Sequence, residues 1–520
     1  MTHVAVVLAA GKSTRMRSHL PKAAHQIAGR PLLAHVLLAA GAALRLNTPP
    51  AAPMMEDASA DAEDHSTQPS TQLIVVLGHE ASQVRRALDA TPGLPPYLVA
   101  HQTAQRGTGD ALRAAQPLCE QSRHRDHPSN HADTVLVLYG DSPLVHPETL
   151  AALLAAHERE RATLTFLTGQ ADGPTGYGRV LRDTSGHVQG IIEERHATPE
   201  QARIPEVNSG IYCFRAGWLW PHLDHLEPHQ PSGEYYLTDL VALAAREGQP
   251  IATLSAPLSE TAGVNDRVEL AAASAILRRR ILDDLMRSGV TIVDPATTYV
   301  DASVRIGQDT TLHPFTTLQG ATTIGANCAI GPHSVIRDST IADGCVVLGS
   351  WLEQAVMDAG ARIGPMSHLR PGAHLAPGAH LGNFGEVKNA TIGPDVQMHH
   401  FSYIGDASIG AGSNVGAGVI TVNYDGEKKQ HTEVGEDVFL GCDTLLIAPI
   451  ALGDDAFTGA GAVVKRDVPP GGVAVGMPAR VIRHREPRER KRHQPPAQGA
   501  PESIPHDDTP HDSTTKGEQA

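Results

Sequence analysis

Two stretches near the start of the chain combine small residues with cations. The first is Leu8-Ala9-Ala10-Gly11-Lys12-Ser13-Thr14-Arg15-Met16, and the second is Pro21-Lys22, six residues on. Small side chains let the backbone approach a base and phosphates closely, and Arg15 and Lys22 can neutralise a triphosphate. A glycine-rich turn alone is weak evidence, but here two cations are fixed relative to the turn. The pattern predicts a nucleotide site that differs from a Walker loop, because no GK[ST] follows four residues after a first glycine.

A carboxylate follows a second apolar run, in Tyr139-Gly140-Asp141-Ser142-Pro143. A lone aspartate after a strand is usually a surface residue. In a mostly parallel sheet, however, ligands lie beyond the carboxyl ends of the strands, and both Gly11 and Asp141 fall at such ends. This position favours a ligand role for Asp141.

The elements that must position these residues alternate between strands and helices. Buried strands are predicted at Val4–Ala9, Leu73–Leu77 and Thr134–Tyr139, and Pro31–Ala43 has helical apolar spacing. Such alternation predicts an α/β fold, a doubly wound, Rossmann-like sheet over residues 1–265. Helical spacing continues over 266–288, which we expect to be a linker helix. Residues 47–72 and 121–132 are polar insertions, expected to be disordered surface loops.

The second half of the chain repeats an aliphatic residue at every sixth position. The run from Ile306 to Ile336 keeps this step, and so do the runs from Trp351 to Val387 and from Val434 to Leu452. A helix or a plain strand has no such period, whereas a parallel β-helix has one short strand and one turn per hexapeptide. We expect a left-handed β-helix over residues 289–482, with about nine triangular coils. The glycines that follow many of these aliphatic residues are expected to supply positive φ in the turns.

Composition limits the classes of function. The formal net charge of −15 argues against nucleic acid as the main partner. The five cysteines are odd in number and show no CxxC spacing, which argues against zinc and a disulfide framework. The apolar run at 4–10 is too short for a signal peptide, and no stretch has the length of a membrane span. We expect a cytoplasmic protein without membrane attachment, and residues 483–520 are expected to form a disordered tail.

The first half resembles the sugar-1-phosphate nucleotidylyltransferases, whose signature is LAAGxxTRM followed by LPK. The further segments that carry the resemblance are Gln105-Arg106-Gly107-Thr108-Gly109, Tyr139-Gly140-Asp141-Ser142-Pro143, Thr175-Gly176-Tyr177-Gly178-Arg179, Glu193, Asn208-Ser209-Gly210 and Gly263-Val264-Asn265.

Four segments of the second half extend the resemblance. They are Leu369-Arg370-Pro371-Gly372, Asn383-Phe384-Gly385-Glu386-Val387-Lys388, His399-His400-Phe401-Ser402-Tyr403-Ile404-Gly405-Asp406 and Asn423-Tyr424-Asp425-Gly426. Over about residues 2–482 the chain is similar to the bifunctional bacterial N-acetylglucosamine-1-phosphate uridylyltransferases / glucosamine-1-phosphate N-acetyltransferases. The resemblance implies acetylation of glucosamine-1-phosphate by acetyl-CoA. Transfer of UMP from UTP to N-acetylglucosamine-1-phosphate then yields UDP-N-acetylglucosamine and diphosphate.

For uridylyl transfer, the resemblance implies Lys22 and Arg15 as catalytic cations and a Mg²⁺ ion bound by Asp141 and Asn265. These groups offset the repulsion between two polyanions. Gln105 would contact the uracil. The nucleotide or UDP-sugar contacts that the resemblance implies are Leu8, Ala9, Ala10, Gly11, Lys22, Gln105, Gly107, Thr108, Tyr139, Gly140, Asp141, Gly178, Glu193, Asn208 and Asn265.

For acetyl transfer, it implies that His400 is the general base, since an imidazole titrates near neutral pH and His400 has HxxY spacing with Tyr403. Its neighbour His399 is expected to be solvated, on the opposite face of a strand. Arg370 and Lys388 would hold the sugar phosphate. Tyr403 and Asn414 would contact the sugar.

The acetyl-CoA contacts implied are Ala417, Asn423, Tyr424, Cys442, Ala460 and Arg480. Cys442 stands where the family usually carries serine, and Glu194-Arg195 and Gly476-Met477-Pro478-Ala479-Arg480 also depart from its pattern. Residues 422–433 interrupt the six-residue register, which predicts a loop leaving the prism. Such a loop can reach a neighbouring prism and share its site, so we expect a homotrimer.

Two alternatives stay open from the sequence. One is a single-activity sugar nucleotidylyltransferase with a structural β-helix, as in ADP-glucose and GDP-mannose pyrophosphorylases, and lack of acetyl transfer would favour it. The other is a non-catalytic interaction or regulatory protein. The presence of Lys22, Asp141 and Asn265 argues against the second.

Overall fold

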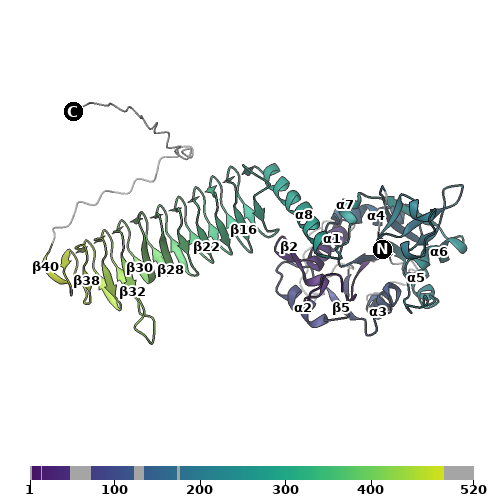
Figure 1. Ribbon diagram of the computed structural model, residues 1–520, viewed down its shortest axis with the longest axis horizontal. Coiled ribbons are helices and arrows are strands. Elements are labelled where there is room, and N and C mark those ends of the chain that lie inside the picture. The colour runs from purple at the N-terminus through teal and green to yellow at the C-terminus, as the bar shows by residue number, and fades with distance from the viewer. Residues whose placement is uncertain (1–2, 13, 47–71, 122–133, 173–175, 485–520) are drawn as a thin grey trace, which may run out of the picture. The chain divides into compact units, whose positions relative to one another are not determined.

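The computed structural model describes residues 3–12, 14–46, 72–121, 134–172 and 176–484 (Figure 1). The chain divides into two compact units, Met1–Arg280 and Ile281–Ala520. The division falls inside α8 (Arg267–Arg287), where the linker helix was expected. The predicted loops at 47–72 and 121–132 lie outside the described residues, except that Gln72 begins a strand and Gln121 ends a helix. The predicted tail lies outside them from residue 485 on.

The first unit is built on a nine-stranded sheet with the path β11-β7-β10-β6-β1-β4-β5 and the pair β8–β9 attached to β10. Strands β6, β1, β4 and β5 are parallel, whereas β10 runs antiparallel to both β6 and β7. The mostly parallel α/β sheet is therefore confirmed. The strand bounds are β1 His3–Ala9, β4 Gln72–Leu77, β5 Leu98–His101, β6 Thr134–Tyr139, β7 Leu164–Gln170, β8 Arg179–Arg182, β9 Val188–Ile192, β10 Glu206–Arg215 and β11 Ile251–Ser255, with a small pair β2 Gln26–Ile27 and β3 Arg30–Pro31.

Both faces of this sheet are covered by helices, which is why its central strands are apolar throughout. Alternate residues of β1 enter two different cores: Val4 and Val6 pack with α3, α5 and α6, and Ala5 and Val7 pack with α1 and α4. The helices are α1 Leu32–Leu46, α2 Ala81–Asp89, α3 Thr108–Gln121, α4 Pro147–Arg159, α5 Ala216–Leu223, α6 Asp239–Arg246 and α7 Leu258–Thr261. Among the described residues, no helix combines the length and apolarity that crossing a membrane requires.

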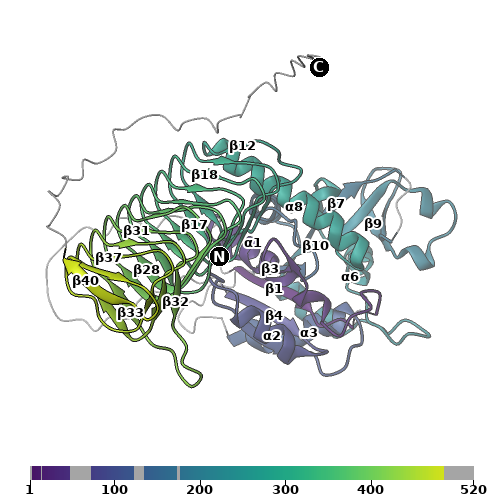
Figure 2. The same ribbon diagram turned by 60° about the vertical axis from the view of Figure 1, so that its left-hand side comes forward.

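The second unit is a parallel β-helix, which Figure 2 shows as a stack of flat coils. One side is a twelve-stranded sheet, whose last strand, β40, is antiparallel. Eleven parallel strands on one side exceed the nine coils expected. The bounds are β12 Thr291–Ile292, β15 Thr311–Leu312, β18 Ala329–Ile330, β21 Val346–Val347, β24 Arg362–Ile363, β27 His380–Leu381, β29 Gln397–Met398, β31 Asn414–Val415, β34 Phe439–Leu440, β37 Phe457–Thr458, β39 Gly472–Val475 and β40 Arg480–His484.

The other two sides share a seventeen-stranded sheet, because the long strands β28 and β30 run around one corner of the prism. We call the side that follows β29 the second side, and the next one the third side. Second-side strands are β13 Tyr299–Val300, β16 Thr317–Gln319, β19 Val335–Arg337, β22 Trp351–Glu353, β25 His368–Leu369, the first halves of β28 Gly385–Ile392 and β30 Ser402–Ile409, β32 Ile420–Val422, β35 Leu445–Ile447 and β38 Val463–Val464. Third-side strands are β14 Arg305–Ile306, β17 Thr323–Ile324, β20 Thr340–Ile341, β23 Val356–Met357, β26 Ala373–Leu375, the second halves of β28 and β30, β33 Thr432–Val434 and β36 Ile450–Leu452.

The six-residue register places most of the predicted aliphatic residues inside the prism, but it is wrong at Trp351. Trp351 is 50% exposed, and Leu352 points inward at 0%. The coils are shorter here, since Val335 pairs with Trp351, sixteen residues on, whereas Thr311 pairs with Ala329, eighteen residues on. The inward positions of this region are Ile341, Val347, Leu352 and Met357, so that some sides advance by five residues.

The glycines after the inward residues serve two different purposes. Gly331 has φ +98°, as expected for a turn. Gly307 lacks a positive φ, and a Cβ there would lie 2.6 Å from Ala326 N of the next coil. Positive φ is taken instead by residues such as Asp309 and Asn327. The expectation of positive φ is therefore wrong for part of the set, in which glycine lets adjacent coils touch.

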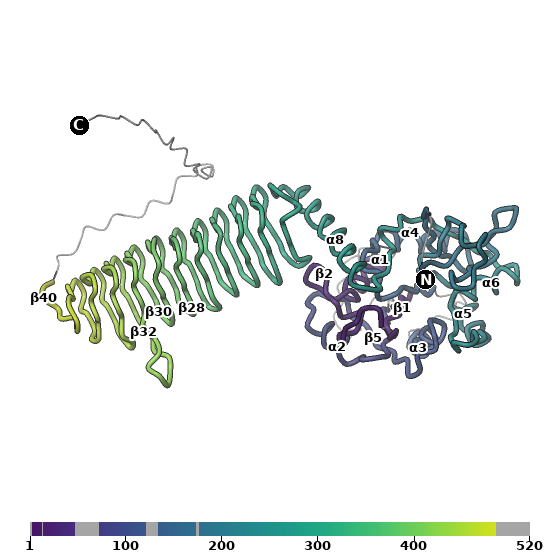
Figure 3. The backbone as a smooth tube through the Cα atoms, in the orientation of Figure 1, coloured from purple at the N-terminus to yellow at the C-terminus, as the bar shows by residue number. Residues whose placement is uncertain are grey.

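The predicted register break is a loop that projects from the prism between β32 and β33 (Figure 3). We call residues 423–431 the projecting loop. Its ends come close together, because Gln430 N donates to Asn423 O at 2.7 Å, and Tyr424 forms an antiparallel bridge with Lys429.

The corrected register makes a prediction about stability. Leu352→Ala should lower the free energy of unfolding of the β-helix by about 2–5 kcal/mol, because it opens a cavity in the core. Trp351→Ala should lower it by about 1 kcal/mol or less, because its ring is largely solvated. Urea unfolding followed by circular dichroism would measure both. Equal losses, or a larger loss for Trp351, would contradict the register seen here.

Candidate active sites

The residues predicted to bind a nucleotide line one pocket at the carboxyl ends of β1 and β6. Its volume is about 520 Å³. The predicted residues on its wall are Leu8, Ala9, Ala10, Gly11, Arg15, Lys22, Gln105, Gly107, Thr108, Tyr139, Gly140 and Asp141. A Cβ on Gly11 would meet no described atom within 4 Å, so the turn after β1 leaves open space. The fold thus gathers segments that are far apart in sequence.

Lys22 and Arg15 converge on two oxygen-bearing side chains. Lys22 Nζ donates to Asp141 Oδ2 and, at 3.2 Å, to Asn265 Oδ1, which also accepts a hydrogen bond from Arg15 Nη2 at 2.8 Å. The Asn265 backbone N–H donates to Glu269 Oε2 at 2.6 Å, which fixes the residue just before α8. One ammonium therefore contacts the carboxylate and the amide oxygen together.

This arrangement fits a hard divalent cation. Both oxygens approach one point that a positive charge occupies, and carboxylate and amide oxygens are the ligands that Mg²⁺ prefers. Within the described part of the chain, no group of three His, Cys, Asp or Glu side chains is placed to hold a metal. The remaining coordination positions would have to come from water and ligand phosphates.

The pocket wall includes residues that were not predicted from the sequence, among them Gln102 and Glu234. Gln102 follows β5, and its Nε2 donates to Asp110 Oδ2 at 2.8 Å and to Gly107 O at 3.2 Å. Glu234 reaches the wall from a segment more than 100 residues later. Gly107 is closely covered by that segment, because a Cβ there would lie 2.6 Å from Tyr235 O. Glu234 is identified only by contacts between distant segments, whereas Gln102 contacts residues five and eight positions later in the chain.

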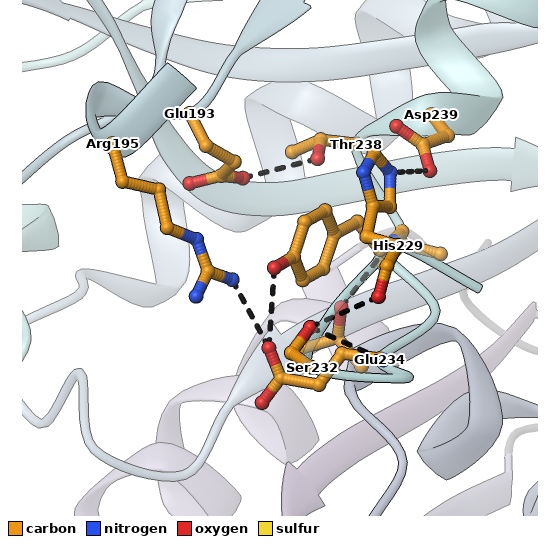
Figure 4. A network of polar contacts seen from close by, with 10 residues as sticks. Glu193, Arg195, His229, Ser232, Glu234, Thr238 and Asp239 are labelled. Atoms are coloured by element: carbon orange, nitrogen blue, oxygen red, sulfur yellow. Dashed lines mark hydrogen bonds and ion pairs between the residues drawn. The ribbon is translucent and has the colours of Figure 1, made fainter.

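The segment around Glu193 and the segment around Glu234 form one polar network (Figure 4). Thr238 Oγ1 donates to Glu193 Oε1 at 3.0 Å. Glu234 Oε2 accepts from Arg195 Nη2 at 3.0 Å and from the Tyr236 hydroxyl at 3.2 Å. The guanidinium of Arg195 lies 4.8 Å from the centre of the Tyr236 ring, a cation–π contact.

The Tyr236 ring also contacts a histidine. It stacks on His229 at 4.3 Å, and His229 Nε2 lies 2.7 Å from Asp239 Oδ2. Arg195, one of the residues that depart from the family pattern, thus contacts both Glu234 and the Tyr236 ring.

Gly178, Glu193, Asn208 and Asn265 do not line the nucleotide pocket itself. Asn208 Nδ2 donates to the Tyr212 hydroxyl at 2.6 Å, and Asn208 N donates to Gly178 O at 2.9 Å. Gly210, with φ +81°, permits the close approach of the Tyr139 ring, and burial raises the pKa of the Tyr139 phenol. Ser13 and Thr175 lie outside the described residues.

In the β-helix, several predicted residues share the corner between the second and third sides. Arg370 Nη1 donates to Glu386 Oε1 at 2.9 Å. Lys388 lies in β28 one coil later, and the neighbouring ammonium of Lys429 lowers the pKa of Lys388. Lys429 comes from the projecting loop and was not predicted. These three cations, Arg370, Lys388 and Lys429, suit a phosphate group, and we call this corner the cation corner.

Tyr403 and Asn423 belong to the same region. The Asn423 amide lies 3.5 Å from the Tyr403 hydroxyl. Asn414 lies elsewhere, on the first side, where it pairs with Gln397. Within one chain, Asn414 therefore lies apart from the cation corner.

The corner between the first and second sides, which we call the His400 corner, carries a different set of residues. His400, Ala417, Cys442 and Ala460 each lie two residues beyond an inward-facing position in successive coils, after β29, β31, β34 and β37. Backbone contacts tie this stack together, since Asp443 N donates to Ala417 O and Gly461 N to Cys442 O. Cys442 is exposed. Tyr424 lies apart in the projecting loop, and Arg480 begins β40.

The expectation that His399 and His400 lie on opposite faces of a strand is wrong. Both are exposed and lie in the turn after β29, so strand alternation does not separate them. They differ because the His399 ring makes an edge-on contact with His380 of the preceding coil, 4.5 Å between centroids. That contact holds His399 against its own prism.

Comparisons with known proteins cover both units. The family described as MobA-like NTP transferase domain matches residues 5–203, and the bacterial transferase hexapeptide (six repeats) matches residues 303–338. The chain is similar to "Bifunctional protein GlmU" from Exiguobacterium sibiricum, with 40% identity over 91% of this chain and 97% of the relative. It is 42% identical to the proteins of that name from Mycolicibacterium vanbaalenii, over 90% and 89%, and Pelobacter propionicus, over 92% and 96%.

Proposed function

This chain belongs to the family of bifunctional GlmU proteins, and we propose how its residues divide the two reactions of that family. The enzyme acetylates glucosamine-1-phosphate with acetyl-CoA. It then transfers UMP from UTP to N-acetylglucosamine-1-phosphate, which gives UDP-N-acetylglucosamine and diphosphate. The observation that carries the assignment is the similarity over both units. A coupled assay with each acceptor, UTP and acetyl-CoA tests it, and absence of either product would overturn it.

In uridylyl transfer, Lys22 and Arg15 are proposed to neutralise the phosphates as the sugar phosphate attacks the α-phosphorus of UTP. Their charges lie where Asp141 and Asn265 hold them in the free protein. Mg²⁺ bound by Asp141 and Asn265 would stabilise the negative charge that develops on the phosphates. Gln105 and its glycine loop are proposed to contact the uracil, and Glu193 and Asn208 the sugar.

In acetyl transfer, His400 is proposed to take a proton from the substrate ammonium, so that the amine can attack the thioester of acetyl-CoA. Arg370 and Lys388 are proposed to hold the sugar phosphate, and Tyr403 and Asn414 to contact the sugar. Ala417, Cys442 and Ala460 continue the His400 corner, so an extended acetyl-CoA molecule placed there would present its thioester beside the base.

The two corners suggest that this site is shared between chains. The amine and the phosphate of glucosamine-1-phosphate sit on adjacent carbons, whereas His400 and Gly405, the residue paired with Lys388, lie at opposite ends of the second side. The strand from Ser402 to Gly405 alone spans roughly 10 Å. The His400 corner also carries apolar residues that are more than half exposed: Phe315, Met366, Phe384 and Phe401. Such a ridge is typical of an interface. We propose a homotrimer in which the His400 corner of one prism faces the cation corner of its neighbour.

The first expected outcome concerns the metal carboxylate. Asp141→Asn should abolish UDP-N-acetylglucosamine formation while acetyl transfer stays within about twofold, because Asp141 belongs to the other compact unit. Each half-reaction is measured alone, with ready-made N-acetylglucosamine-1-phosphate for the second. Loss of acetyl transfer in a folded variant would contradict the separation of the sites.

The second prediction concerns the general base of acetyl transfer. His400→Ala should reduce acetyl transfer roughly 10²–10⁴-fold and leave uridylyl transfer unchanged. His399→Ala is the matched control and should be nearly silent, because its ring is held by His380. Rates of both variants across pH would check this, since the substrate amine can lose its proton unaided at high pH. Loss of acetyl transfer in His399→Ala, with acetyl transfer retained in His400→Ala, would mean that the base is assigned to the wrong residue.

The third prediction concerns the acetyl-transfer site that we propose is shared between chains. Light scattering should give the mass of three chains. Coexpression of His400→Ala with Lys388→Ala, each inactive alone in acetyl transfer, should restore about a quarter of the wild-type activity by random pairing of intact half-sites. A fully active monomer, or mixed oligomers without recovered activity, would rule out the shared site.

A further inference from the structure

Asp406 is a buried carboxylate at the cation corner. It lies within β30, is 9% exposed and has a φ of +48°. Its Oδ1 accepts a hydrogen bond from Asn389 Nδ2 at 2.6 Å. Its Oδ2 accepts one from Asn423 Nδ2 and lies 3.5 Å from Lys429 Nζ. This carboxylate therefore joins the coil before it to both ends of the projecting loop.

The charges around Asp406 explain why a carboxylate is needed here. Burial alone would raise the pKa of Asp406, but the hydrogen bonds from Asn389 and Asn423 and the charge of Lys429 outweigh it and lower the pKa. Lys429 in turn stands beside Lys388, a like charge. The negative charge of Asp406, 3.5 Å from Lys429 Nζ, offsets the repulsion that Lys429 meets beside Lys388.

We propose that Asp406 is a positioning residue for acetyl transfer, which holds the Asn423 amide and the Lys429 ammonium at the cation corner beside Lys388. This inference rests on the acetyl-transfer site proposed above. When the sugar phosphate binds, Lys429 can exchange its contact with Asp406 for the phosphate, while Asn389 and Asn423 keep the carboxylate occupied. The loop is thereby fixed before the substrate arrives, which reduces the entropy lost on binding.

The side chain at position 406 must be an acceptor at both of its oxygens. Asp406→Asn keeps the shape but replaces one oxygen by an NH₂ group, which then faces the NH₂ group of Asn389 or of Asn423. Loss of hydrogen bonds to a charged group corresponds to about a 10- to 100-fold fall in kcat/KM for glucosamine-1-phosphate. We expect most of it to be a rise in KM, since Lys429 and Lys388 would no longer present their charges together.

If Asp406 acts through the neighbouring cations, its replacement also changes the pH dependence of kcat/KM. Asp406 raises the pKa of both Lys388 and Lys429, so Asp406→Asn should lower both. The ammonium groups then lose their protons at lower pH, and the alkaline limb of kcat/KM for glucosamine-1-phosphate moves to lower pH. The other charged or titratable groups that influence this corner are Arg370, Glu386, Tyr403 and Glu353.

The test measures acetyl transfer by the full-length chain carrying Asp406→Asn, alone and combined with Asn423→Ala. If Asp406 acts through Asn423, the two losses overlap, and the double variant is less impaired than the product of the single effects. Asp338→Asn is the matched control. Asp338 also has a positive φ, 49°, and carries a carboxylate in the β-helix. Its Oδ1 accepts a hydrogen bond from the Ala321 backbone N–H at 2.9 Å.

Support requires the rise in KM, the shifted alkaline limb and the overlap with Asn423→Ala, with uridylyl transfer and the Asp338→Asn control unchanged. Wild-type kinetics in Asp406→Asn would overturn the positioning role. So would a loss of kcat/KM that multiplies fully with Asn423→Ala at an unchanged pH profile, as a merely structural defect gives. Failure of the wild-type chain to acetylate glucosamine-1-phosphate would instead refute the proposed function, which the same assay detects first.

Discussion

The contact of each coil with the next is the constraint on which the β-helix and its site depend. A strand of two or three residues cannot bury a side chain by itself, so each inward residue packs on its counterparts one coil before and one coil after. The backbones approach so closely at positions such as Gly307 and Gly441 that a Cβ would lie 2.6 Å from an atom of the next coil. Because the register repeats, residues distant in sequence line up along a corner. His400 therefore stands in line with Ala417, Cys442 and Ala460, and Arg370 with Lys388.

Both units solve the same electrostatic problem in a chain whose formal charge is −15. Under the proposed function each site must offer cations to a phosphate, and in each a lysine lies beside a carboxylate: Lys22 beside Asp141, and Lys429 beside Asp406. A carboxylate partner keeps the lysine in a defined place. The pair is only partly buried in both cases, so the Coulomb energy lost when the phosphate replaces the carboxylate is moderate.

Much of the architecture followed from patterns in the sequence, and the failures have identifiable causes. The six-residue period predicted the core from Leu312 to Ile336 because these coils have regular eighteen-residue spacing. It failed at Trp351 because a period says nothing about where a corner loses a residue. The expectation that ligands lie beyond the carboxyl ends of parallel strands correctly placed Gly11 and Asp141 in one pocket. Glu234, Lys429 and Asp406 were missed because their partners lie in other elements, and no local pattern records such contacts.

The shortened coils have a consequence for how this scaffold changes length. In an ordinary sheet, deletion of one residue from a strand turns its remaining side chains to the opposite face. Here the sides of five residues keep Ile341, Leu352 and Met357 inward, so the turn absorbs the difference and the strand does not. The corners therefore tolerate gains and losses of single residues. The projecting loop, residues 423–431, is a longer insertion at such a corner. Evolution could lengthen this loop toward a ligand without disturbing any stacked strand.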